Sequence, residues 1–68
     1  MLTDRERDAL DAIKKYIEEE KIAPSIRDLG NIMGLSSTAT VQRHLESLER
    51  KGYIKRRKDT PRSISLMD

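Results

Sequence analysis

Cysteine, tryptophan and phenylalanine are absent from this 68-residue chain, and its only aromatic residues are two tyrosines. Without cysteine it can form neither a disulfide nor a thiolate metal site, and its single histidine, His44, cannot hold a metal alone. No apolar run approaches the ~20 residues of a membrane-spanning helix, and no signal peptide opens the chain. We therefore expect one small domain with no cofactor, no metal and no membrane contact, in a reducing cytoplasm.

The charges are unevenly distributed along the chain, although the net charge is only +2. Residues 1–40 carry six Lys or Arg and eight Asp or Glu, whereas residues 41–68 carry eight Lys or Arg and four Asp or Glu. A basic C-terminal half on a nearly neutral chain favours one face that binds a polyanion. Charge alone leaves open the alternative of a solvated surface with scattered charge.

A capping box and an apolar stripe predict a first helix over about 3–20. Thr3 and Glu6 have the spacing at which each side chain bonds the backbone N–H of the other, and apolar residues then recur at helical spacing. Pro24 ends any continuation of this helix, because proline lacks an N–H and restricts the residue before it.

A second helix is predicted over about 26–33, with Ser25 as its N-cap and Asp28 three residues on in an imperfect capping box. Its expected apolar face consists of Ile26, Leu29, Ile32 and Met33. Gly30 lies inside this helix at a cost of about 1 kcal/mol relative to alanine, which favours a close approach by another helix. Gly34 is expected to end the helix, because glycine readily adopts the left-handed conformation found there.

A third helix is predicted over about 37–51, between the N-cap Ser37 and the terminating Gly52. Its apolar seam is Val41, Leu45 and Leu48. The remaining residues predict a hairpin with strands at about 53–57 and 62–66.

Two helices joined by a tight turn are typical of a helix-turn-helix, and a hairpin after the second makes it a winged one. We therefore predict that residues 1–68 form one mainly α, three-helix winged helix-turn-helix DNA-binding domain with a small antiparallel β-hairpin.

The side of the third helix opposite its apolar seam is the predicted DNA-reading face. The first half of a recognition helix enters the major groove most deeply. Arg43 has the donors to bond guanine, Gln42 matches adenine, and Thr40 offers a methyl group to thymine. The predicted base-reading residues are Ser37, Thr38, Ala39, Thr40, Gln42 and Arg43.

The alternative for this segment is an ordinary solvent-facing helix. Against that alternative, residues 36–40 are unusually small and uncharged for an exposed helix start, which lets the backbone approach a partner closely. Glu46 counts against DNA, because its carboxylate repels phosphate unless it accepts from cytosine or pairs with Arg43 or Arg50.

The hairpin supplies most of the expected contacts to the DNA backbone. It carries five cations, Lys55, Arg56, Arg57, Lys58 and Arg62, and only Asp59 opposes them within it. A merely soluble hairpin would not require so large a bias. The predicted backbone-contacting residues are Arg27, Ser36, Arg50, Lys55, Arg57, Lys58 and Arg62.

Several segments in one register carry a family resemblance. They are Pro24-Ser25-Ile26-Arg27-Asp28-Leu29, Met33-Gly34-Leu35, Ser37, Val41, His44-Leu45, Leu48-Glu49, Lys51-Gly52-Tyr53-Ile54 and Pro61-Arg62. Together they resemble the DNA-binding domain of LexA repressors, in the style of Gram-positive members. The resemblance implies a repressor of DNA-damage-response (SOS) genes, in the bacterial cytoplasm at the nucleoid, that binds palindromic operators of double-stranded DNA as a dimer. Carried over by position, Ser37, Ala39, Thr40, Gln42 and Arg43 read the bases.

LexA repressors also carry a C-terminal self-cleaving domain with a Ser-Lys pair, which dimerises them. This chain ends at Asp68, where the linker would begin, so we expect a non-enzyme that is monomeric alone and dimeric on DNA or through a further domain. A standalone phage or plasmid regulator is an alternative. A winged-helix protein-interaction module is another, since the fold does not fix the function, but such a module needs an exposed apolar patch.

Overall fold

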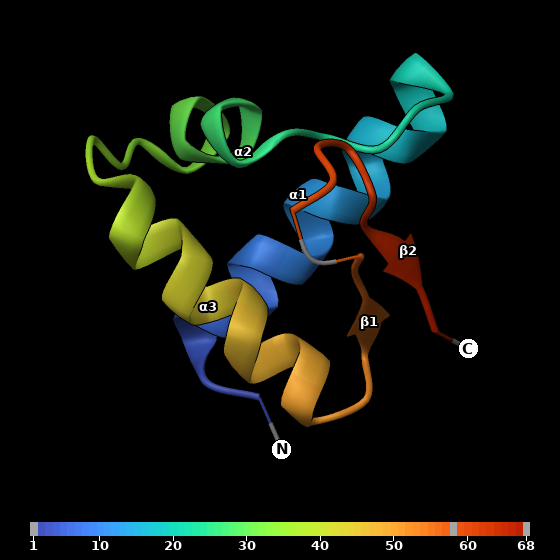
Figure 1. The fold of residues 1–68 in the computed structure, drawn as a ribbon. Coiled ribbons are helices and arrows are strands. Elements are labelled where there is room, and N and C mark those ends of the chain that lie inside the picture. The colour runs from blue at the N-terminus through green and yellow to red at the C-terminus, as the bar shows by residue number, and fades with distance from the viewer. Residues whose placement is uncertain (1, 58, 68) are drawn as a thin grey trace.

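Three helices and a two-stranded hairpin follow one another along the chain (Figure 1). The structure, a computed structural model, describes residues 2–57 and 59–67. The elements are α1 (Asp4–Glu20), α2 (Ile26–Met33), α3 (Thr38–Arg50), β1 (Ile54–Lys55) and β2 (Ser65–Leu66). This architecture confirms the predicted winged helix-turn-helix. Among the described residues, no helix has the length and apolarity to cross a membrane.

Local side-chain contacts fix where the helices begin. Thr3 Oγ1 accepts from the Glu6 N–H at 3.1 Å, and Glu6 Oε1 accepts from the Thr3 N–H at 2.9 Å. Ser25 and Asp28 make the same reciprocal pair at the start of α2, at 3.0 Å each. Each pair satisfies backbone donors that would otherwise lack partners, so the helix starts are encoded locally.

The core is shared by all three helices and the hairpin. Its buried apolar residues are Ala9, Leu10, Ile13, Leu29, Val41, Leu45, Leu48, Ile54 and Ile64. The predicted seam of α3 is confirmed, because its three members are at most 1% exposed. The core thus fixes which side of α3 faces outwards.

The prediction that Ile32 faces the core is wrong, because its side chain is 53% exposed. The buried side of α2 is centred between Leu29 and Gly30. At 100° per residue, Ile32 lies well round the helix from Gly30. The close packing of Gly30 rotates α2 towards the glycine and carries Ile32 into solvent.

The strands are shorter than the predicted 53–57 and 62–66. Asp59 and Arg62 have left-handed φ angles of 61° and 54°, which interrupt extended geometry. The Ser63 hydroxyl accepts from the Arg57 N–H and donates to the Arg57 carbonyl, each at 3.0 Å, in place of a ladder partner. The ladder therefore stops after two residue pairs, Ile54 with Leu66 and Lys55 with Ser65.

Candidate nucleic-acid interface

The turn between α2 and α3 holds these helices close together. Gly34 adopts a left-handed φ of 71°, and the Leu35 N–H donates to the Gly30 carbonyl at 2.8 Å. A Cβ at Gly30 would lie 3.1 Å from the Leu35 carbonyl oxygen and 3.6 Å from Val41 Cγ2 of α3. The predicted close approach at Gly30 is therefore made by the turn first and by α3 second. Glycine permits the packing that sets the angle between α2 and α3.

The start of α3 is exposed and uncharged. Ser37 Oγ accepts from the Thr40 N–H at 3.4 Å, and the first turn of the helix contains no acid. Thr40 is half-buried, and the other predicted base-reading residues, Ser37, Thr38, Ala39, Gln42 and Arg43, are exposed, as is Ser36. A helix start with outward N–H groups and no nearby carboxylate favours an anion such as phosphate.

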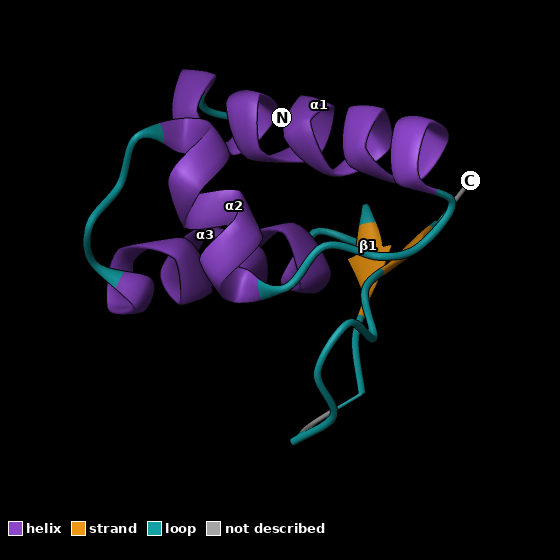
Figure 2. Cartoon of the chain, turned by 90° about the horizontal axis from the view of Figure 1, so that it is seen from above, coloured by secondary structure: helices purple, strands orange, loops and turns teal. Residues whose placement is uncertain are grey.

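A groove of about 880 Å³ lies between the start of α2, one side of α3 and the hairpin. Thr38 and Gln42 line it from α3, next to Glu46 and Glu49. Arg27 lines it from α2, and Arg57 and Arg62 line it from the wing. Figure 2 shows the hairpin loop projecting beyond the helices on the side away from α1. The groove thus brings two base-reading candidates together with three backbone-contacting candidates.

The other predicted residues lie outside this groove. Ala39 and Arg43 are exposed on α3, and Lys55 is exposed on β1. Arg50 is the last residue of α3, about 18 Å along the axis from Thr38 at 1.5 Å per residue. Lys58 lies outside the described residues.

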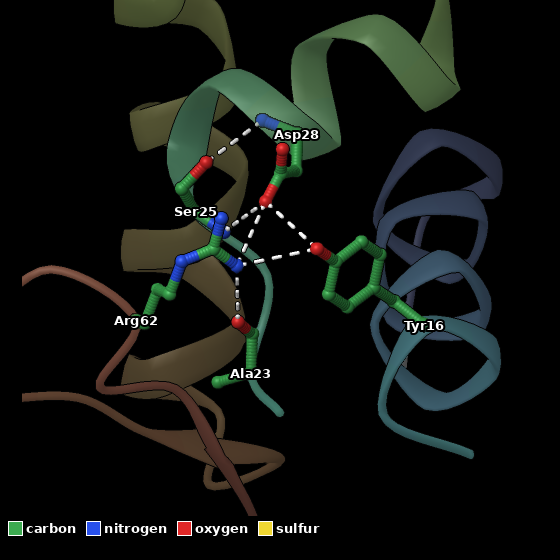
Figure 3. Close-up of polar contacts among 5 residues, drawn as sticks. All are labelled: Tyr16, Ala23, Ser25, Asp28 and Arg62. Atoms are coloured by element: carbon green, nitrogen blue, oxygen red, sulfur yellow. Dashed lines mark hydrogen bonds and ion pairs between the residues drawn. The ribbon is translucent and has the colours of Figure 1, made fainter. Parts of the chain in front are cut away.

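Two arginines of the hairpin are bonded to the helices. Arg56 Nε lies 3.2 Å from Glu49 Oε1 of α3. Arg62 Nη1 lies 3.0 Å from Asp28 Oδ2, 3.2 Å from Tyr16 Oη and 3.0 Å from the Ala23 carbonyl oxygen (Figure 3). Among the described backbone-contacting candidates, Arg62 is therefore distinguished by a guanidinium that already has these partners within the domain.

These contacts perturb both charged groups. The Ser25 backbone N–H is the largest of several influences that hold the pKa of Asp28 below its usual value, with Tyr16 and Arg62 also contributing. The hydrogen bond to Tyr16, followed by the charge of Asp28, raises the pKa of Arg62. Sequence reasoning assigned Asp28 only to a helix cap and did not single out Tyr16 at this position.

Comparison with known proteins decides what kind of helix-turn-helix this is. Residues 1–63 match the family model described as LexA DNA binding domain. The chain belongs to this family. It is 43% identical over 67 residues to the LexA repressor of Desulfitobacterium hafniense, covering 98% of this chain and 33% of that protein. It is 46% identical over 66 residues to the LexA repressor of Bacillus mycoides, covering 97% and 32%. The chain therefore spans about a third of the length of these relatives.

A buried carboxylate ties α1 to α3 in this LexA DNA-binding domain. Glu6 is 6% exposed, and Lys51 Nζ lies 2.7 Å from its Oε1. The Ser47 hydroxyl donates to the other carboxylate oxygen. Hydrogen bonds from Lys51, Ser47 and the Thr3 backbone lower the pKa of Glu6 from 4.5 to about 2. The sequence marked Glu6 only as a capping residue, because its partners in α3 and at its end lie 41 and 45 positions away.

Replacing Glu6 with glutamine is expected to flatten the acid end of the stability profile of this LexA-family domain. A pKa lowered on folding means that ionised Glu6 stabilises the fold above about pH 4.5, and that this contribution is lost as the pH falls towards about 2. Glu6→Gln should therefore melt at a lower temperature than the unaltered domain near pH 7, and the difference should vanish below about pH 2.

Thermal melting followed by circular dichroism across this pH range measures the effect. Glu19→Gln, an exposed charge-matched change on the same helix, serves as the control and should keep the unaltered pH profile. Parallel pH profiles for Glu6→Gln and the unaltered domain would show that the contacts of Glu6 do not govern its acid stability.

Proposed function

We propose that this domain binds double-stranded DNA sequence-specifically, as the reading part of a LexA-like transcriptional repressor of DNA-damage-response genes in the bacterial cytoplasm. The observation that carries the proposal is the exposed, acid-free start of α3 beside a groove whose facing wall holds wing arginines. In this position the helix start enters the major groove while the wing lies along the phosphates.

Base reading is assigned to the exposed first half of α3. Arg43 bonds guanine O6 and N7, Gln42 bonds adenine N6 and N7, and Thr40 or Ala39 packs against a thymine methyl. Ser37 and Thr38 lie at the helix start, where N–H groups meet the backbone or a base edge. Glu46, which lines the groove beside Gln42, suits an acceptor for a cytosine amino group.

Sequence-independent contacts to the DNA backbone are assigned to Ser36 and to the cations around the reading helix. Arg27 and Arg57 line the groove, and Ser36, Arg50 and Lys55 are exposed around it. Lys58 joins this set on its charge alone. Such contacts fix the register of the domain on the duplex without reading sequence.

The operator is proposed to be palindromic, with one domain on each half-site. Two-fold symmetry of the protein matches palindromy of the site, and half-sites are spaced by about one helical turn or its multiples. In the proposed repressor, a further domain couples the two copies. The isolated 68-residue chain should then bind weakly, because its two half-site contacts are not linked.

Titration of the domain with two duplexes tests this proposal. One is a palindromic LexA-type operator, and the other contains the same bases in scrambled order. We expect tighter binding to the operator and a log affinity that falls linearly with log salt, by about 0.9 for each phosphate neutralised. Equal affinity for both duplexes, or an affinity independent of salt, would contradict the proposed function.

A further inference from the structure

The direction of the wing is not fixed by its strands. We use wing loop for the segment between β1 and β2, of which the structure describes residues 56–57 and 59–64. The two strands form a ladder of only two residue pairs. A ladder this short is marginal by itself, so contacts of the loop with the helices decide where it points. On one side, Ile64 is buried in the core and Arg56 is bonded to Glu49 of α3. Arg62 makes further contacts with the helices.

Arg62 joins the wing loop to both of the other helices. Its Nη1 meets Asp28 of α2 at 3.0 Å and Tyr16 of α1 at 3.2 Å, and the Tyr16 hydroxyl donates to Asp28 Oδ2 at 3.1 Å. We call these three side chains the Tyr16–Asp28–Arg62 cluster. Figure 3 shows them converging from α1, α2 and the loop, next to the Ala23 carbonyl. One carboxylate oxygen therefore accepts from two separate elements and from the backbone of its own helix cap.

The backbone at Arg62 depends on this cluster. Its φ of 54° lies in the left-handed region, which costs free energy for a residue other than glycine. Such conformations persist where the surroundings over-determine them. Here the three acceptors around the guanidinium hold the residue in place, and the same residue turns the chain into β2.

Stability is not the main consequence of the cluster. The Arg62 side chain remains 44% exposed, so solvent screens its attraction to Asp28. The position of the cluster matters more than its stability. Asp28 also forms the capping box of α2, and α2 packs directly against the reading helix. The cluster therefore places the wing relative to α2, which packs against the reading helix α3.

We infer that the Tyr16–Asp28–Arg62 cluster is a positioning device for the wing, and that Arg62 acts on DNA through the placement of the wing loop and not as a phosphate ligand. The inference rests on the proposed DNA-binding function. It predicts whether one substitution strengthens or weakens binding to DNA. Asp28→Asn removes a negative charge near the groove, so it would strengthen binding if Arg62 were thereby freed to contact phosphate. If Asp28 holds the wing in place, the same change weakens binding.

The test measures binding of a mixed-sequence duplex of about 20 base pairs, since wing contacts do not depend on sequence. Fluorescence anisotropy between about 50 and 200 mM salt gives the affinity and its salt slope. We expect Asp28→Asn to bind more weakly, with a slope shallower by about 0.9 for each phosphate that the displaced wing no longer neutralises, at a temperature where the variant remains folded. Asp11→Asn, the same charge change on the exposed side of α1, should bind as tightly as the unaltered domain or more tightly.

Tyr16→Phe provides a second variant that changes no charge and removes only the hydroxyl. It should also weaken binding and reduce the salt slope, whereas Tyr53→Phe, the same change at the only other tyrosine, should not. Binding by Asp28→Asn that equals or exceeds that of Asp11→Asn would overturn the inference, as would identical binding by the two tyrosine variants. Absence of binding by the unaltered domain would instead overturn the proposed function, and the inference with it.

Discussion

Leu45→Ala is expected to destabilise the domain by about 2–5 kcal/mol, the usual cost of truncating a buried leucine. Leu45 is 0% exposed and lies at the centre of the α3 seam, between Val41 and Leu48. A domain of 68 residues has a total stability of about 3–10 kcal/mol at 0.05–0.15 kcal/mol per residue. The substitution should therefore remove about half of the stability, and with it the fixed orientation of the reading face.

Urea denaturation followed by helical circular dichroism measures this loss as a shift of the midpoint at constant slope. Glu46→Ala, at the adjacent exposed position, is the matched control and should stay within about 0.5 kcal/mol of the unaltered domain. Similar midpoints for the two variants would show that Leu45 is not the packed residue that the structure describes.

Arg43→Ala is expected to weaken binding to the preferred duplex by about 1–3 kcal/mol. It should also relax the discrimination between bases at the one position that Arg43 contacts. Arg43 is exposed on α3, away from the core and outside the groove between α2, α3 and the hairpin. Its guanidinium is therefore available to a base edge. A bidentate arginine contact distinguishes guanine from the other bases, and alanine cannot replace either bond.

A panel of duplexes, each with one base pair changed, measures this effect in competition with the unaltered sequence. Arg57→Ala is the comparison, because it removes one positive charge from the wing loop instead of from α3. It should weaken every duplex equally and make the salt slope shallower by about 0.9. If Arg43→Ala also weakens all members of the panel equally, the division between reading helix and gripping wing is wrong.

The helices and their order could be predicted because their determinants are local. Thr3 with Glu6 and Ser25 with Asp28 are each three residues apart, and both capping boxes form. The seam of α3 repeats at helical spacing, and its core-facing side follows from that spacing alone. The exposed face of α3, with its predicted reading residues, then follows by elimination.

The errors arise where packing overrides the local pattern. Ile32 fits the apolar face of an isolated helix, but Gly30 lets the turn and α3 approach α2 closely on one side, and Ile32 then faces solvent. In an eight-residue helix, one close contact is enough to set the rotation. The strands are also shorter than alternation predicts, because Arg62 is left-handed and the Ser63 hydroxyl bonds the Arg57 backbone in place of a ladder partner.

By itself, the sequence determined the winged helix-turn-helix, its basic half and the outward face of α3, because caps, periodic seams and charge counts act over a few residues. Only the tertiary structure decided the rotation of α2, the burial of Glu6 and the partners of Arg62. The last two depend on contacts between residues 34–46 positions apart, as in Glu6 with Lys51 and Arg62 with Asp28. Such contacts form only after the helices have packed, and no local pattern encodes which distant side chain packing brings within reach.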